Sequence, residues 1–222
     1  MKLVNPLKLI CLLTLLAGSI ISCKKAKDEI LNPDEKEVPQ AVKDFMYFKL
    51  GTYWIYQDSI TGDLDSTYVF STKNGKDTSS FFTMVGYLTI ISHYSVMETK
   101  SMHFNKMYKY SCYASKPTID NYILTNRTAN NNGLENIVFA YPLDLGKQFI
   151  LNENTITIDH FYESLTVASN TFQDVYCISQ TKDQTEDDSE TKFYIAKNFG
   201  IIKKEISGRN ENWKLIRSHI VQ

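Results

Sequence analysis

Residues 52–71 read TYWIYQDSITGDLDSTYVFS, and this stretch decides the fold class. In its first six and last six residues, aromatic and β-branched side chains alternate along the chain, a period-two pattern typical of β-strands. The segment between them contains Thr61-Gly62-Asp63, a combination typical of turns. The stretch therefore predicts two antiparallel strands, and the alternation places Trp54 and Tyr56 on the same face of the first.

The same alternation continues to the C-terminal end of the chain. Asn74-Gly75 predicts a hairpin turn, because both residues tolerate a positive φ. No helical stripe separates the strands, so the pattern predicts an all-β fold, a curved antiparallel sheet or an open β-barrel rich in meanders. One turn of helix is expected at 39–44. Further strands are expected at 81–87, 89–97, 101–113, 121–125, 137–141, 148–152, 155–168, 171–181, 191–197, 201–207 and 213–220.

Composition supports the all-β prediction and excludes other classes. The chain has 8 Ala against 14 Tyr, 19 Thr and 21 Ile, a bias toward residues that suit a pleated surface. A formal net charge of −1 excludes a protein organised around nucleic acid, which needs a basic excess to neutralise phosphates. An apolar fraction of 43% excludes disorder for the bulk of the chain.

The N-terminal residues predict an export signal. Lys2 and Lys8 form a short basic region, and the apolar run from Leu9 to Ile21 that follows is 13 residues long. A membrane-spanning helix needs about 20 residues. Residues 1–22 are therefore interpreted as a cleaved signal peptide.

Ile20-Ile21-Ser22-Cys23 resembles the lipobox of bacterial lipoproteins, in which the cysteine is lipidated. The resemblance implies a palmitate-bearing lipid anchor on Cys23 and attachment to the bacterial outer membrane, on its periplasmic or cell-surface face. The alternative is an ordinary secretory signal with an incidental cysteine.

The residues after Cys23 predict a tether. Residues 24–40 hold nine charged side chains and two prolines. We interpret 23–44 as a lipidated, disordered tether and 45–222 as a single β-domain.

Five segments carry a further resemblance: YFKLGTYWIYQ (47–57), NTFQDVY (170–176), FYIAK (193–197), GIIKKE (200–205) and WKLI (213–216). In this order they resemble uncharacterised secreted lipoproteins of the Bacteroidetes type. The resemblance implies a curved antiparallel sheet or open barrel, with no established activity. It leaves residues 75–135 unmatched, and Asn170 stands where the family pattern has glycine.

Two segments of the chain resemble each other. Residues 48–51 (FKLG) precede Trp54, and residues 143–146 (LDLG) precede Phe149. Each places a Leu-Gly turn shortly before an aromatic strand. The similarity is consistent with a degenerate internal duplication, or with two similar strand entries in one β-fold.

The sequence offers no catalytic motif, so we expect no catalytic residue, no metal site and no cofactor. The histidines lack zinc spacing. Alternation predicts that His160 is a half-buried strand residue that shares a face with Ile156 and Ile158. The acidic stretch 183–190 and the pair Asp63 and Asp65 are interpreted as solvated loops. The four histidines are His93, His103, His160 and His219.

Two function hypotheses follow. The first is a non-catalytic envelope lipoprotein whose domain binds an apolar or glycan ligand or has a structural role. The second is a hydrolase that acts on envelope glycans or lipids. A pocket lined by aromatic and aliphatic side chains favours the first, and paired carboxylates in one pocket favour the second. Cys112 and Cys177 form either a disulfide in an oxidising compartment or two separately buried thiols.

Overall fold

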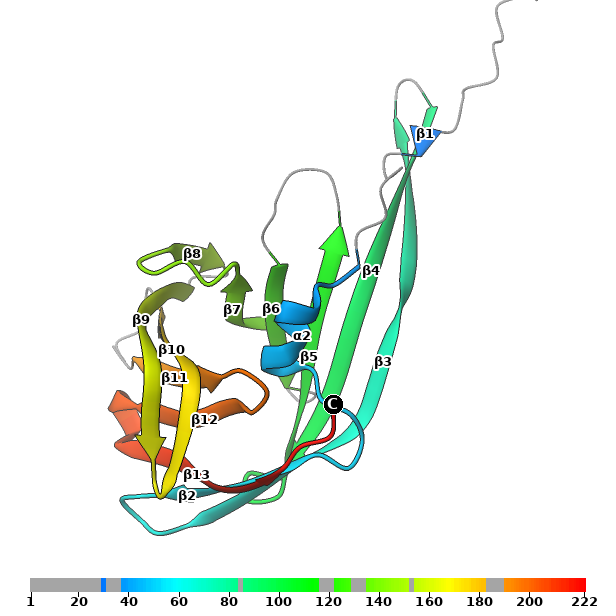
Figure 1. Cartoon of the computed structure of the whole chain (residues 1–222). Helices are drawn as coiled ribbons and strands as arrows, with labels where there is room; N and C mark the ends of the chain where they lie inside the picture. The colour runs from blue at the N-terminus through cyan, green and yellow to red at the C-terminus, as the bar shows by residue number, and fades with distance from the viewer. Residues whose placement is uncertain are drawn as a thin grey trace, which may run out of the picture.

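The computed structural model of the protein describes residues 29–30, 37–83, 86–115, 122–128, 135–151, 154–182 and 190–222. Within these ranges the chain forms one antiparallel sheet, confirming the all-β prediction (Figure 1). The sheet is strongly curved, but it does not close into a barrel. Its long strands are β2 (Tyr53–Asp58), β3 (Leu64–Thr83), β4 (Gly86–Ser101), β5 (Lys106–Ser115), β6 (Tyr122–Thr128), β7 (Glu135–Tyr141), β8 (Gln148–Leu151), β9 (Asn154–Val167), β10 (Asn170–Lys182), β11 (Thr191–Ala196), β12 (Gly200–Ile206) and β13 (Glu211–His219).

The order of these strands shows two six-stranded meanders joined at one seam. The spatial order is β7-β6-β5-β4-β3-β2-β13-β12-β11-β10-β9-β8, so every strand lies beside its neighbour in sequence except at the seam and at the ends. The seam is the antiparallel pairing of β2 with β13, the first and last long strands. The two ends of the sheet, β7 and β8, are consecutive in sequence.

The same local turn precedes both meanders. In residues 49–52 and 144–147, the carbonyl of the first residue accepts a hydrogen bond from the N–H of the fourth, at 3.2 and 3.1 Å. Gly51 and Gly146 occupy the third position of each turn with φ of 93° and 76°, a conformation that favours glycine. The sequence similarity between these segments therefore corresponds to an equivalent structure at the start of each half.

The helix α2 (Gln40–Met46) packs against the curved sheet and belongs to the core (Figure 1). Its buried Val42 and Met46 join one hydrophobic cluster with Cys112 of β5 and Ile178 of β10. Val38 is buried in the same cluster. The folded domain therefore begins before residue 45, and the tether that we expected to reach residue 44 is shorter.

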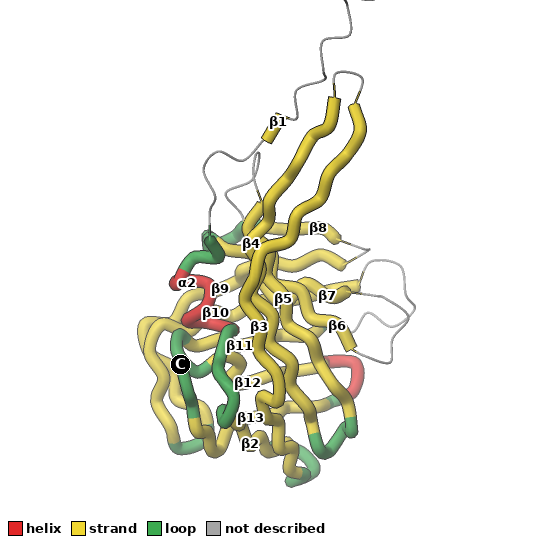
Figure 2. The backbone as a smooth tube through the Cα atoms, turned by 90° about the vertical axis from the view of Figure 1, so that its right-hand side faces the viewer, coloured by secondary structure: helices red, strands yellow, loops and turns green. Residues whose placement is uncertain are grey.

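The β3–β4 hairpin is much longer than expected and projects beyond the body of the domain (Figures 1 and 2). The turn predicted at Asn74-Gly75 is wrong, because both residues lie inside β3, paired with Ser95 and Tyr94. A Cβ added at Gly75 would lie 2.6 Å from the Tyr94 hydroxyl oxygen. Glycine at this position thus makes room for a cross-strand aromatic side chain rather than for a turn.

The two-residue strand β1 (Glu29–Ile30) pairs in parallel with β4, at Leu88 and Thr89 near the end of this hairpin. Both views show β1 at the far end of the hairpin, well away from α2 (Figures 1 and 2). This short stretch of the expected tether is therefore extended and hydrogen-bonded rather than disordered.

Candidate functional site

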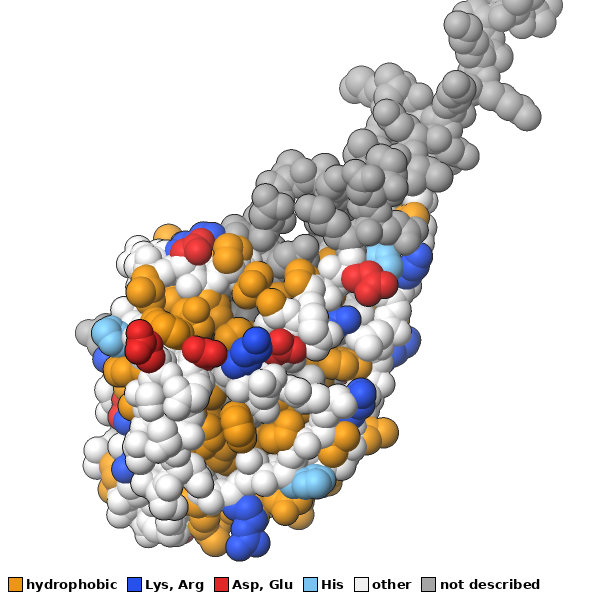
Figure 3. Space-filling view, in the orientation of Figure 1, with side chains coloured by type: hydrophobic (Ala, Val, Ile, Leu, Met, Phe, Trp, Pro, Cys, Tyr) orange, Lys and Arg blue, Asp and Glu red, His pale blue; other side chains and the backbone are white. Residues whose placement is uncertain are grey.

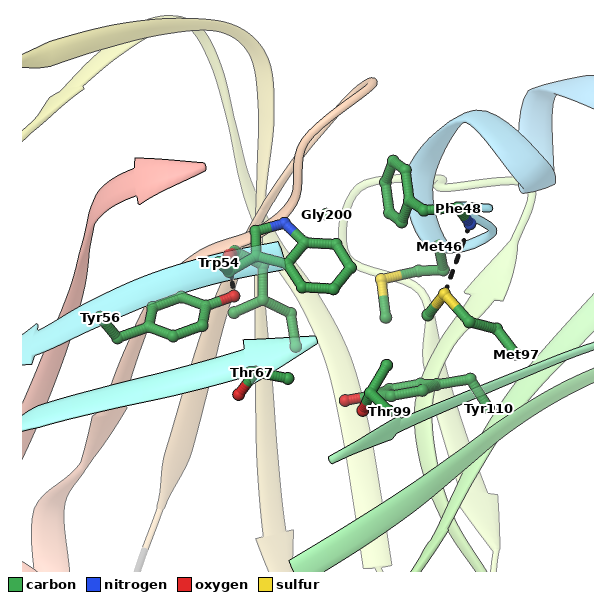
Figure 4. A pocket seen from close by; sticks show the side chains of 10 residues that line it. Met46, Phe48, Trp54, Tyr56, Thr67, Met97, Thr99, Tyr110 and Gly200 are labelled. Carbon is green, nitrogen blue, oxygen red and sulfur yellow. Dashed lines mark hydrogen bonds between the residues drawn. The ribbon is translucent and has the colours of Figure 1, made fainter. Parts of the chain in front are cut away.

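A small cavity lies where α2 meets the first strands of the sheet, and it is the candidate site for a ligand (Figure 4). Its lining comes from both halves of the chain, since β12 contributes beside β2, β3, β4 and β5. Trp54 and Tyr56 both line it, as their alternation on β2 predicts. The full lining consists of Met46, Phe48, Trp54, Tyr56, Thr67, Met97, Thr99, Tyr110, Gly200 and Ile201.

The polar groups at this cavity mostly bond to the protein itself. The Trp54 indole N–H donates to the Phe199 carbonyl at 2.7 Å, and the Tyr56 hydroxyl donates to the Ile201 carbonyl at 2.8 Å. The Phe48 backbone N–H is 3.3 Å from the Met97 sulfur (Figure 4). The first two bonds tie β2 to the start of β12, and the third ties the segment after α2 to β4.

The volume of the cavity is about 30 Å³, space for a water molecule rather than a sugar ring. No carboxylate, histidine or cysteine is among its lining residues. Burial raises the pKa of Tyr56 and of Tyr110 well above the usual value, so both phenols stay protonated at neutral pH. The cavity thus offers neutral hydroxyls and thioethers, without a general base or a nucleophile.

Two buried carboxylates serve as hydrogen-bond acceptors in turns. Asp58 accepts backbone N–H bonds from Ile60 and Asn212, both at 3.1 Å, and so ties the β2–β3 turn to β13. Asp65 accepts from the Ser101 hydroxyl at 2.8 Å and from the His103 backbone N–H at 3.1 Å. Asp65 is buried, so its interpretation as part of a solvated loop is wrong.

Lys204 is a titratable group outside the cavity lining. It lies on β12 between its cross-strand neighbours Phe193 and Trp213, with Nζ 5.8 Å from the centre of the Phe193 ring. Burial lowers the pKa of this amine, although the Glu211 carboxylate acts in the opposite direction. Neutral lysines form Schiff bases in some enzymes. Here the amine lies over the Phe193 ring, and Lys204 does not line the cavity.

His103, His160 and His219 lie against aromatic rings. His103 packs against Phe104 and Trp213, with ring centres 4.8 and 5.4 Å apart. His160 is exposed and lies 4.4 Å from the Tyr162 ring, so its predicted half-buried position is wrong. The register of β9 shifts beside it, at Cys177 and Ile178 of β10, and breaks the alternation from which burial was expected.

The remaining predicted site residues fall in different places. Cys112 and Cys177 are buried free thiols on β5 and β10, the arrangement of the second alternative. Burial raises the pKa of Cys112 to about 12, which keeps it protonated and unreactive. Cys23 and residues 183–189 of the acidic stretch lie outside the described residues. Across the described ranges, no group of three or more His, Cys, Asp or Glu residues is placed to hold a metal ion.

Comparison with known proteins found no matching family model, no matching curated protein and no matching solved structure. The fold and the site geometry are therefore the basis for assigning a function.

Proposed function

We propose that this protein is a lipoprotein of the bacterial outer membrane, attached through Cys23, and that its β-domain is a non-catalytic binding or structural module. The sequence Ile20-Ile21-Ser22-Cys23 supports the anchor, and the cavity lining carries the non-catalytic role. The lining consists of aromatic, aliphatic, thioether and hydroxyl side chains, the composition expected of a binding module rather than a hydrolase. A ligand larger than a water molecule needs a binding surface other than this cavity.

The chemistry of the buried acids supports the same proposal. A hydrolytic site needs a base or nucleophile within hydrogen-bond reach of an orienting group and open to substrate. Asp58 instead accepts hydrogen bonds from Ile60 and Thr61 of the β2–β3 turn, and Asp65 accepts them from Ser101 and His103 at the end of β4. Acidic and basic side chains lie interspersed on the face of the body seen in Figure 3. No helix in the described parts of the chain is long and apolar enough to span a membrane.

The anchor is tested by expressing the full chain, with its signal, in a Gram-negative host. Detergent phase partition and mass spectrometry of the N-terminal peptide then follow the modification. We expect the wild-type protein in the detergent phase with acyl chains on Cys23. The Cys23→Ala variant should move to the aqueous phase, because the acyl chains provide the membrane affinity.

The matched control is Ser22→Ala, which keeps a small residue before the cysteine and should leave lipidation intact. A Cys23→Ala protein that still fractionates with membranes after its signal is removed would contradict the anchor. The non-catalytic role is tested by screening the same protein against ester, glycoside and peptide substrates. Turnover that is lost in His160→Ala would contradict it.

A further inference from the structure

The end of the β3–β4 hairpin has the properties of a membrane-contacting tip. Phe81 and Phe82 are 54% and 76% exposed, large values for aromatic side chains inside a strand. Because they are consecutive, they point to opposite faces of the two-stranded ribbon. The chain carries no charged residue between Asp77 and His93. An uncharged end with exposed aromatics on both faces suits insertion end-on into a lipid surface.

The tip also extends far enough to reach such a surface. Among the described residues, the pairing of β4 with β5 ends at Ser92, which lies opposite Asp77 of β3. Phe82 lies five residues beyond Asp77, which is about 17 Å at the rise of a β-strand. Figures 1 and 2 show this part of the hairpin standing clear of the body. The aromatic pair can therefore enter a membrane while the body stays in water.

The position of β1 keeps the proposed anchor within reach of the same tip. Glu29 of β1 pairs with Leu88, which lies opposite Phe81 in the hairpin. Glu29 is the sixth residue after Cys23, a reach of at most about 21 Å. A lipidated Cys23 thus holds this end of the molecule, rather than the body, next to the bilayer.

The backbone limits how deep the tip goes. On its outer edge, β3 pairs with β2 only as far as Tyr68, and within the described residues no other strand covers that edge toward the tip. Uncovered N–H and C=O groups are costly in hydrocarbon but not among hydrated headgroups. β1 covers part of the other edge, at Leu88 and Thr89 of β4. Because part of these edges is uncovered, the tip is expected to lie in the interfacial layer of the membrane and not at its centre.

From these observations we propose that the β3–β4 tip, through Phe81 and Phe82, inserts into the interfacial layer of the membrane in which Cys23 is anchored. This proposal rests on the proposed lipid anchor. The acyl chains provide the attachment, and the tip provides a second contact that orients the domain, with the long hairpin as a stalk.

The test uses the full lipidated chain, reconstituted in phosphatidylethanolamine–phosphatidylglycerol vesicles with or without brominated acyl chains. The Phe82→Trp variant carries the probe at the tip. The matched control is Phe70→Trp, on the same strand, where the replaced side chain is also exposed. The wild-type emission, from Trp54 and Trp213, is the baseline.

We expect the emission added by Phe82→Trp to shift to the blue and to lose most of its intensity in brominated vesicles. The emission added by Phe70→Trp should do neither.

Each other outcome overturns the proposal in a recognisable way. Flotation of the vesicles reports the anchor separately from the tip. A chain that floats while neither added tryptophan is quenched overturns the tip contact and leaves the anchor standing. Equal quenching of both variants shows that the body, not the tip, lies on the membrane. A blue shift that grows with protein concentration, without quenching, shows that the tip contacts a second copy of the chain instead of the membrane. A chain that neither floats nor carries acyl groups overturns anchor and tip together.

Discussion

At the scale of single residues, Asp58 shows how a buried carboxylate stabilises this fold. Burial alone raises its pKa, but hydrogen bonds from the Asn212 and Ile60 amides and from Thr61 outweigh burial, and the pKa lies below its usual value. We expect Asp58→Ala to lower the free energy of unfolding at pH 7 by about 2 kcal/mol, because two backbone amides and the Thr61 hydroxyl lose their acceptor. Urea unfolding measures the change.

The pH dependence follows from the direction of that shift. A lowered folded-state pKa adds stability above the unfolded-state pKa, near 4, and this stability is lost as the pH falls through the folded-state pKa. The difference between wild type and Asp58→Ala should therefore shrink from pH 7 to pH 3. Asp63→Ala, an exposed carboxylate in the same turn, is the control and should change stability little. Equal losses from both substitutions would contradict the role assigned to Asp58.

Asp65 shows why sequence reasoning misses such residues. In the sequence it stands two residues from Asp63, on the other side of Leu64, and the two carboxylates look alike. In the structure Asp65 lies at the start of β3. Besides a bond from the nearby Thr67 hydroxyl, it receives hydrogen bonds from residues 36 and 38 positions away. The signal that separates the two acids is a contact across strands, and no local pattern contains it.

At the scale of elements, the turn between β11 and β12 depends on the size of Gly200 as well as on its φ of +79°. A Cβ there would lie 3.1 Å from Cε2 of Phe48, a buried ring that packs against Trp54. We expect Gly200→Ala to cost about 2–3 kcal/mol, the sum of an unfavourable φ and a close contact that a buried ring cannot relieve. Thermal or urea unfolding gives the value.

Gly62 separates the two causes, because it has nearly the same φ, +81°, and nothing within 4 Å of an added Cβ. Gly62→Ala should cost only about 1 kcal/mol, the conformational part alone. If the two alanine variants lose the same stability, the contact with Phe48 does not matter and the packing argument fails.

The elements also show where local sequence patterns succeed and fail. The strands β9 to β13 match their expected ranges to within about two residues, as usual for such boundaries. The first half of the sheet is less well predicted because Asn74-Gly75 looks like a turn, and a turn there divides β3 in two. What keeps the strand continuous is its pairing with β4, which places the Tyr94 ring over Gly75. That partner is 19 residues away, outside any local window.

The candidate cavity was still less predictable. The alternation in β2 places Trp54 and Tyr56 together, and both line the cavity. The other walls come from α2, β4, β5 and β12, and their meeting depends on the β2–β13 seam and on the burial of the helix. The sequence predicts a short helical turn at 39–44 but shows nothing of its packing into the core.

At the scale of the whole molecule, both hydrophobic clusters contain residues of both meanders. One joins Cys112 of the first half with Ile156 of the second, and the other joins Trp54 with Leu215. Neither half can therefore keep its core without the other. We expect one cooperative unfolding transition, in which tryptophan fluorescence and far-ultraviolet circular dichroism change at the same urea concentration. Trp54 on β2 and Trp213 on β13 report on the two halves.

The control is a Trp213→Phe variant, in which only Trp54 remains. Its tryptophan fluorescence and its circular dichroism should give the same midpoint of urea unfolding. Two separate transitions would show that the meanders are independent units, and would favour duplication of a stable six-stranded domain over one continuous fold.

The β2–β13 seam sets an order of events during synthesis. The ribosome makes β2 about 150 residues before β13. Until the nine residues of β13 emerge, β2 and β12 each keep an open edge. Pairing between such distant segments is slow, because a long loop must close before the contacts form. The nascent chain therefore cannot complete this sheet before β13 has been made, and two strand edges stay open to other partners until then.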